Sequence, residues 1–182
     1  IADIDEEMYR KIVENRSVKD KDAKDTAKIV GLSAIKYGDL SNQATKDYIF
    51  DVDRFTSFEG NTGPYILYTI VRIKSILNRY VQEGGDLSAG KILPAVNASE
   101  KNLMLQLSGF AAMVENAFEE KAPHKICAYI YEVSNAFNSF YHETKILSEE
   151  NQAQKESFLQ LLQLTRRVLE TSIDLLGFSA PD

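Results

Sequence analysis

Several kinds of residue are scarce in this 182-residue chain, and each scarcity excludes a class of site or protein. There is no tryptophan, and the two histidines, His124 and His142, are far apart in sequence and in no metal-ligand pattern. The single cysteine, Cys127, excludes an internal disulfide and fits a reducing compartment such as the cytoplasm. No apolar run approaches the roughly 20 residues needed to span a bilayer. The sequence therefore predicts a cytoplasmic protein with no metal site and no membrane partner.

Signatures of catalysis are also missing. No phosphate-binding or dinucleotide-binding glycine pattern is present, and no serine, threonine or cysteine lies in a known nucleophile context. We therefore predict no catalytic residue in the chain and no cofactor bound to it. Its first residues, Ile1 to Glu7, are acidic and begin without methionine, which excludes a signal peptide and indicates a piece of a longer protein.

Charge is unevenly distributed along the chain. The formal net charge is −6, whereas nucleic-acid-binding domains are often basic. Acidic residues gather in three stretches that we expect to be solvated faces, at residues 3–7, 115–120 and 149–150. The charged residues from position 65 to position 80 are all basic: Arg72, Lys74 and Arg79. One basic helix face on a mildly acidic protein is compatible with RNA binding.

Helical periodicity of the apolar residues dominates the chain and predicts a mainly α fold. The predicted helices cover approximately residues 4–15, 25–37, 64–82, 97–118, 124–147 and 152–176. The second should break at the run Gly38-Asp39-Leu40-Ser41, and the third should stop at the Gly84-Gly85 pair. The last four are long and follow one another through short loops, which is typical of a helix bundle.

The helix predicted over residues 97–118 has a recognisable start. Asn97, with Glu100 three residues later, forms a capping box. Its apolar side is predicted from residues at helical spacing: Leu103, Leu107, Phe110, Val114 and Phe118.

Residues 47–58 follow a different pattern. Apolar and polar residues alternate there in short stretches, with Tyr48, Phe50, Val52 and Phe55 prominent. Such alternation is typical of an extended segment or a brief strand, which could pair with parts of a longer protein that are absent here.

A glycine-containing run, Phe58 to Tyr65, predicts the start of the next helix. Its two glycines permit a tight turn, and Thr62 or Asn61 can cap the first helical turn with a side-chain oxygen. Pro64 suits the first helical position, where its missing N–H would have no partner anyway.

The first turns of this helix carry a candidate binding face. Steps of three and four residues place Tyr65, Tyr68 and Arg72 on one stripe. Two phenols and a guanidinium suit a face that stacks on bases and holds a phosphate. Spacing alone favours the plainer interpretation, an aromatic core stripe followed by an ordinary arginine.

Three ordered motifs carry a resemblance to a known family. They are Ala34 to Ser41, Lys46 to Asp51 and the run from Phe58 to Tyr65. In this order and spacing they closely resemble the C-terminal part of arginyl-tRNA synthetases, which are class I aminoacyl-tRNA synthetases. The ending, Leu175 to Asp182, also resembles that family's C-terminus but lacks its usual last residues.

The resemblance implies a fold, an activity and partners. It implies an anticodon-binding helix bundle of the DALR type over residues 58–182, after the end of a catalytic or linking region over residues 1–57. The expected partners are the anticodon loop of tRNA(Arg) and the catalytic domain of the same protein. The parent enzyme would attach arginine to tRNA using ATP with magnesium. This chain lacks the family's HIGH-like and KMSKS-like ATP-binding signatures, so we expect it to be inactive alone.

The resemblance also implies site residues. Tyr65, Tyr68 and Arg72 match positions that face the anticodon loop in this family. So does Tyr141, whose plainer interpretation is an edge residue of the core. Expected phosphate contacts are the remaining cations on or near these helices: Lys74, Arg79 and Lys145.

Two other functions fit the same residues. The chain could be a helical docking module that makes protein contacts, with its tyrosines as interface anchors and no RNA readout of its own. It could instead come from a related synthetase, for cysteine or another amino acid. The motifs at residues 36–40 and 59–65 favour the arginine enzyme over that third interpretation.

Overall fold

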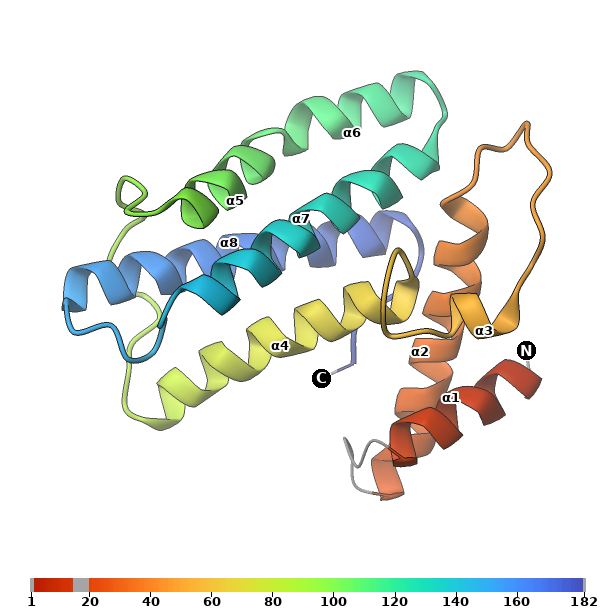
Figure 1. The fold of residues 1–182 in the computed structure, drawn as a ribbon, viewed down its shortest axis with the longest axis horizontal. Helices are drawn as coiled ribbons and strands as arrows, with labels where there is room; N and C mark the ends of the chain where they lie inside the picture. Colours follow the sequence, from red (N-terminus) through yellow and green to blue (C-terminus); the bar gives the residue numbers. More distant parts are fainter. Residues whose placement is uncertain (1, 15–19, 182) are drawn as a thin grey trace.

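The computed structural model of the chain describes residues 2–14 and 20–181. Within them the fold is mainly helical, as the sequence predicts, and contains no strand (Figure 1). The elements are α1 (Ala2–Glu14), α2 (Asp20–Leu40), α3 (Val52–Phe55), α4 (Gly63–Gln82), α5 (Ala98–Ser108), α6 (Phe110–Glu119), α7 (Pro123–Glu143) and α8 (Gln152–Leu175). In the part of the chain described, no helix is both long and apolar enough to cross a membrane.

Helices α4, α7 and α8 run side by side and form the centre of the bundle (Figure 1). α5 and α6 lie along α7 on the outer side, and α2 packs against α4 and α7 with α1 laid across it. Large side chains are fully buried between these helices, among them Ile66, Ile70, Ile130, Phe137, Phe158 and Leu162. Burial of each such side chain stabilises the fold by about 1.5–3 kcal/mol.

The start of α4 is built as the sequence predicts. Gly60 has a φ of +80°, which L side chains rarely adopt, and the Thr62 hydroxyl accepts a hydrogen bond from the Tyr65 N–H at 3.2 Å. Gly63 is needed for close packing of α4 against α2 rather than for a turn. A Cβ there would lie 2.3 Å from the carbonyl oxygen of Ser33, so glycine allows α4 to begin directly against α2.

Asn61, the other candidate cap, bonds elsewhere and ties α2 to the bundle. The Tyr37 hydroxyl lies 2.5 Å from Asn61 Oδ1 and 2.8 Å from the carbonyl oxygen of Cys127. Tyr37 is fully buried, and burial strongly raises the pKa of its phenol. This residue therefore joins α2, the turn before α4, and α7. The domain boundary between residues 57 and 58 stays a prediction.

α2 is longer than predicted, and it ends inside the run of residues 38–41 that should break it. The helix runs from Asp20 to Leu40, so Gly38 itself is helical. A Cβ at Gly38 would lie 2.9 Å from Cγ of the buried Phe55 ring, so this glycine allows close packing inside a helix. A tertiary contact has here overridden the low helix propensity of glycine.

The predicted helix over residues 97–118 is two helices, α5 and α6, separated at Gly109. The Asn97 side chain caps α5 as predicted, accepting from the Glu100 N–H at 2.8 Å, while Glu100 Oε2 accepts from the Val96 N–H at 2.7 Å. Phe118 is 83% exposed, so its assignment to the apolar side is wrong. The apolar side continues through Phe110 and Val114 to Ala117, which is the buried residue of α6, so Phe118 next to it faces solvent.

Two further predictions differ from the structure: the end of α7 and the conformation of residues 47–58. α7 ends at Glu143 rather than near Leu147, because Thr144 is extended. The brief strand considered for residues 47–58 is not present: residues 47–51 are irregular and are followed by the short helix α3. Asp51 favours that helix by accepting a hydrogen bond from the Arg54 N–H at 3.1 Å.

Candidate nucleic-acid interface

The structure brings three of the four predicted anticodon residues into direct contact. Tyr68 and Arg72 lie one turn apart on α4, and Tyr141 lies on the adjacent α7. The Arg72 guanidinium carbon is 4.6 Å from the Tyr68 ring centroid and 5.1 Å from that of Tyr141. Both distances are within the range of cation–π attraction. We call Tyr68, Arg72 and Tyr141 the tyrosine–arginine cluster.

Arg72 is held by neutral groups only. One terminal nitrogen donates to the Tyr68 hydroxyl at 2.8 Å, and the other donates to Asn138 Oδ1 at 2.8 Å. Across the described residues, no carboxylate forms an ion pair with this guanidinium. Its orientation is fixed while its positive charge stays uncompensated, which leaves it able to bind an anion.

Tyr65 has a supporting position next to the cluster. Its hydroxyl donates to Asn135 Oδ1 at 2.8 Å and accepts from Asn138 Nδ2 at 2.8 Å. Its ring meets the edge of Tyr131 with centroids 5.8 Å apart. Burial raises the pKa of the Tyr65 phenol, although the Asn138 bond opposes that effect. The Tyr65 side chain is half-buried, and its hydroxyl forms hydrogen bonds with two side chains of α7.

Asn138 connects the two sets of contacts, and sequence reasoning gave it no role. Its carbonyl oxygen receives Arg72 and its amide nitrogen reaches Tyr65, so one amide ties α4 to α7 at two points. The available signal was spacing: Asn135, Asn138 and Tyr141 recur every three residues along α7. The sequence does not show that this face of α7 packs against α4, so the spacing alone could not indicate a role for Asn138.

The cluster presents aromatic surface to solvent. The Tyr68 side chain is 47% exposed and that of Tyr141 is 37% exposed. The Tyr141 ring stacks on the buried Phe137 ring, with centroids 6.0 Å apart and planes 26° apart, so the core supports it from behind. An exposed ring on a rigid support suits stacking with an unpaired base.

The other predicted cations are not part of the cluster. Lys74 points towards α8 and the chain end, donating to the Pro181 carbonyl at 3.0 Å and pairing with Glu170 at 3.4 Å. Arg79, near the end of α4, pairs with Glu83 at 2.9 Å. Lys145 is exposed and lies beyond the end of α7. Their roles as phosphate contacts stay predictions.

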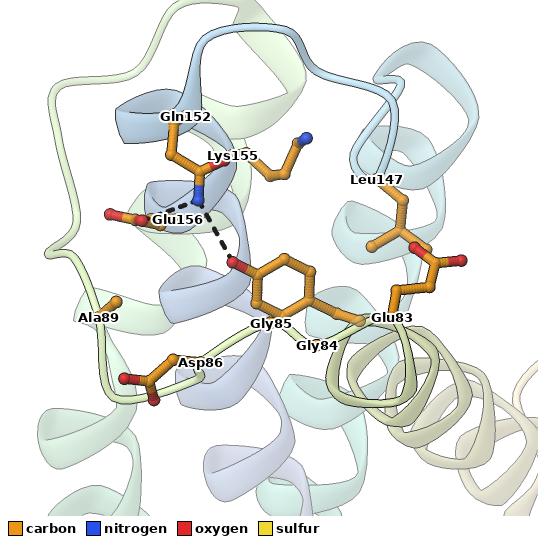
Figure 2. A pocket seen from close by; sticks show the side chains of 10 residues that line it. Glu83, Gly84, Gly85, Asp86, Ala89, Leu147, Gln152, Lys155 and Glu156 are labelled. Carbon is orange, nitrogen blue, oxygen red and sulfur yellow. Dashed lines mark hydrogen bonds between the residues drawn. The ribbon is translucent and has the colours of Figure 1, made fainter.

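A pocket lies at the far end of α4, and its chemistry differs from that of the cluster (Figure 2). Its volume is about 410 Å³, and three of its charged lining residues are acidic: Glu83, Asp86 and Glu156. Lys155 is the one basic residue in that lining. Gln152 spans the pocket, donating to Tyr80 at 3.4 Å and to Glu156 at 2.8 Å (Figure 2). Such a surface repels a phosphate group, so we exclude it as the RNA site.

Comparison with known proteins agrees with the geometry. Residues 66–182 match the family described as the DALR anticodon binding domain. The chain is 65% identical to an arginine–tRNA ligase of Agathobacter rectalis, over all of this chain and 32% of the relative. It is 52% identical to that of Alkaliphilus oremlandii, over 98% of this chain and 30% of the relative.

Solved structures agree as well. The arginyl-tRNA synthetase of Thermus thermophilus superposes with a TM-score of 0.85 at 30% identity, over 99% of this chain and 31% of that chain. The arginyl-tRNA synthetase of Plasmodium falciparum also gives 0.85, at 26% identity, over 99% of this chain and 32% of that chain. The chain spans about a third of the length of the curated relatives it matches and corresponds to their C-terminal part.

Proposed function

The chain belongs to the DALR anticodon-binding domain family, and on that premise we propose that it binds the anticodon loop of tRNA(Arg) as the C-terminal part of an arginine–tRNA ligase. One observation carries the proposal. The Arg72 guanidinium is fixed between the rings of Tyr68 and Tyr141, and it has no ion-pair partner among the described residues.

This arrangement offers both parts of single-stranded RNA recognition. The anticodon loop presents unpaired bases, and stacking of a base on an aromatic side chain contributes about 1–3 kcal/mol. In the proposed complex Tyr141 and Tyr68 supply stacking surface, and Arg72 binds a backbone phosphate or a base edge. Tyr65 contributes from behind, because its hydroxyl and Asn138 hold α4 and α7 in register.

The genetic code sets the specificity that such a site needs. All arginine codons have G in the middle, so every arginine anticodon has C at its centre, while its other two bases vary. We therefore propose strict reading of the central C and loose reading of its neighbours. Cytosine offers an N4 donor with N3 and O2 acceptors, which hydroxyl and backbone groups can match.

Attachment of arginine to tRNA(Arg), with ATP and magnesium, is the activity proposed for the full-length protein, in the cytoplasm. In the described part of this chain, no group of three or more His, Cys, Asp or Glu side chains can hold a metal ion. No chemical step is assigned to these residues. The catalytic domain, in the portion that the relatives have beyond this chain, is the proposed intramolecular partner.

The test is binding to an arginine anticodon stem-loop, compared with the same hairpin carrying U in place of the central C. Fluorescence anisotropy at several salt concentrations measures both affinity and the number of phosphate contacts. Tighter binding to the C hairpin supports anticodon reading. Equal, salt-sensitive binding to both hairpins would leave generic RNA contact only, and no binding to either would favour a docking module that makes protein contacts.

A further inference from the structure

A chain of hydrogen bonds runs from Arg72 through Asn138 and Tyr65 to Asn135. Arg72 donates to Asn138 Oδ1, and Asn138 Nδ2 donates to the Tyr65 hydroxyl. The Tyr65 hydroxyl donates in turn to Asn135 Oδ1. Each of these bonds is 2.8 Å long. The four side chains therefore form one continuous network between α4 and α7.

The direction of the network is fixed at its Arg72 end. A guanidinium can only donate, so the Asn138 amide turns its oxygen towards Arg72 and its nitrogen towards Tyr65. The Tyr65 hydroxyl accepts that bond, and its single proton goes to the oxygen of Asn135. Asn135 Nδ2 is consequently the last donor of the network. Its orientation is set by a guanidinium that it does not touch.

The amide nitrogen of Asn135 has no partner of its own. In the part of the chain that the structure describes, it forms no hydrogen bond. It is also not among the buried polar atoms that lack a partner, so it reaches solvent. A donor that is oriented from behind and open to solvent in front is suited to bind an acceptor on a ligand.

Asn135 lies at the end of the network that is opposite Arg72. Along α4, Tyr65 is one turn before Tyr68 and Arg72 is one turn after it. Arg72 lies over the Tyr68 ring from the later turn, whereas Asn135 is bonded to Tyr65 at the earlier turn. The Tyr68 ring is 47% exposed. A base stacked on that exposed surface therefore lies between the guanidinium and the free amide nitrogen.

We propose that Asn135 reads the central base of the anticodon, with its Nδ2 donating a hydrogen bond to N3 of cytosine. The proposal rests on the proposed function, because it takes the anticodon loop of tRNA(Arg) as the ligand. N3 of cytosine is an acceptor, whereas N3 of uracil carries a hydrogen and is a donor. A fixed donor therefore binds cytosine and meets a second donor in uracil. O2 is an acceptor in both bases, so a bond to O2 could not distinguish them.

The network is what makes an amide selective between two pyrimidines. An unrestrained amide can rotate by half a turn and offer its oxygen to N3–H of uracil. In this site the same rotation would turn Nδ2 of Asn135 towards Tyr65 and leave the Tyr65 proton without its acceptor. The donor end of Asn135 is thereby held towards the ligand.

An altered hairpin tests the contact in the full-length ligase. The hairpin carries 3-deazacytosine at the central position, in which C–H replaces N3 while the N4 amino group and O2 remain. The ligase should bind it about tenfold more weakly than the cytosine hairpin, through loss of one hydrogen bond. Asn135→Ala should bind both hairpins equally. An undiminished loss in Asn135→Ala would show that another group reads N3 and would overturn the proposal.

Asn135→Asp is a second variant that keeps the shape of the side chain and the acceptor for Tyr65. It removes the donor, so the preference for C over U should fall about tenfold, because a carboxylate repels N3 of cytosine and accepts from N3–H of uracil. Ser139→Asp is the matched control for the added charge, since Ser139 is exposed and lies one turn further along α7. It should weaken binding of both hairpins alike and leave the preference unchanged.

The outcomes separate this proposal from the proposed function. If the unchanged ligase prefers C and Asn135→Asp keeps that preference, the role of Asn135 is overturned while anticodon reading stands. If Ser139→Asp lowers the preference as much as Asn135→Asp does, the effect belongs to charge and the role of Asn135 is overturned as well. No preference for C in the unchanged ligase would overturn both proposals.

Discussion

The middle and the end of α4 carry similar side chains in opposite electrostatic settings. Midway along the helix, Arg72 lies over Tyr68, and neutral groups bind its guanidinium. Seven residues later, Arg79 pairs with Glu83 at 2.9 Å, beside the acidic pocket that Tyr80 helps to line. Arg79 is much the more exposed of the two arginines. Exposure alone would therefore select the wrong arginine as the anion-binding residue.

The difference teaches that the partners of an arginine decide what else it can bind. An exposed ion pair adds at most about 1 kcal/mol to stability, yet it places a carboxylate where a phosphate would have to approach. Rings and amides orient a guanidinium without neutralising it. The first arrangement is typical of a solvated surface, and the second is typical of a prepared binding site.

The largest expected effect comes from removing the uncompensated arginine. We predict that Arg72→Ala weakens binding of the arginine anticodon hairpin by about 2–3 kcal/mol, through loss of a charge-assisted hydrogen bond and a cation–π contact. The salt dependence should become shallower by about 0.7 in log–log slope, one phosphate contact. Arg79→Ala is the matched control, and it should change affinity by less than about 0.5 kcal/mol.

Thermal melting separates binding from folding for this pair. Neither variant should lose its helical circular dichroism, since neither arginine is buried in the core. Arg72→Lys sharpens the comparison further. Lysine keeps the positive charge but lacks the planar guanidinium with its paired N–H donors. Most of the affinity for the hairpin should therefore be lost, while the salt dependence of binding is retained. Equal losses of affinity from Arg72→Ala and Arg79→Ala would refute the contrast between the middle and the end of α4.

A second prediction concerns the rings. Tyr141→Ala should weaken hairpin binding by about 1–3 kcal/mol if a base stacks on this ring. Tyr141→Phe should retain most of the affinity, because stacking needs the ring rather than its hydroxyl. Tyr80→Ala, at the acidic end of α4, is the corresponding control and should leave binding unchanged. A large loss of helicity in Tyr141→Ala would instead identify this residue as part of the core.

A third prediction concerns Asn138, which positions Arg72 without needing to touch RNA. Asn138→Ala should weaken binding by about 1 kcal/mol, and the Tyr65 hydroxyl keeps Asn135 as a partner, so the fold should survive. A double-mutant cycle is the decisive measurement. If Asn138 acts through Arg72, then Asn138→Ala should have little further effect once Arg72 is alanine. Additive losses would show that Asn138 acts independently of Arg72.

Local signals in the sequence were sufficient for most of the fold. The cap at Thr62, the turn at Gly60, and the long helices of the bundle follow from short-range chemistry and apolar spacing. The errors arose where a distant segment decides. Gly38 lies inside α2, where the Phe55 ring packs directly against it, and Ala117 rather than Phe118 is the buried residue near the end of α6. The contact between Gly38 and Phe55 is not visible in a window of neighbouring residues.

The candidate site also has a part that the sequence predicts and a part that depends on how the helices pack. Helical spacing places Tyr68 next to Arg72, and resemblance to a family adds Tyr141, so the cluster could be predicted as a set of residues. Spacing could not show that Tyr65 turns inward to α7, or that Asn138 joins it to Arg72. It also could not show that Lys74 is paired with Glu170, since that contact depends on how α8 packs against α4.

The smallest expected effect tests the acidic end directly. Glu83→Gln removes the partner of Arg79 and should tighten hairpin binding by less than about 0.5 kcal/mol, with no change in the preference for C over U. The effect is small because Arg79 lies about 10 Å along the helix axis from Arg72, roughly one Debye length at 0.1 M salt. It should therefore grow as salt is lowered. A gain as large as the loss from Arg72→Ala would mean that any free arginine on α4 suffices, and that the cluster has no special role.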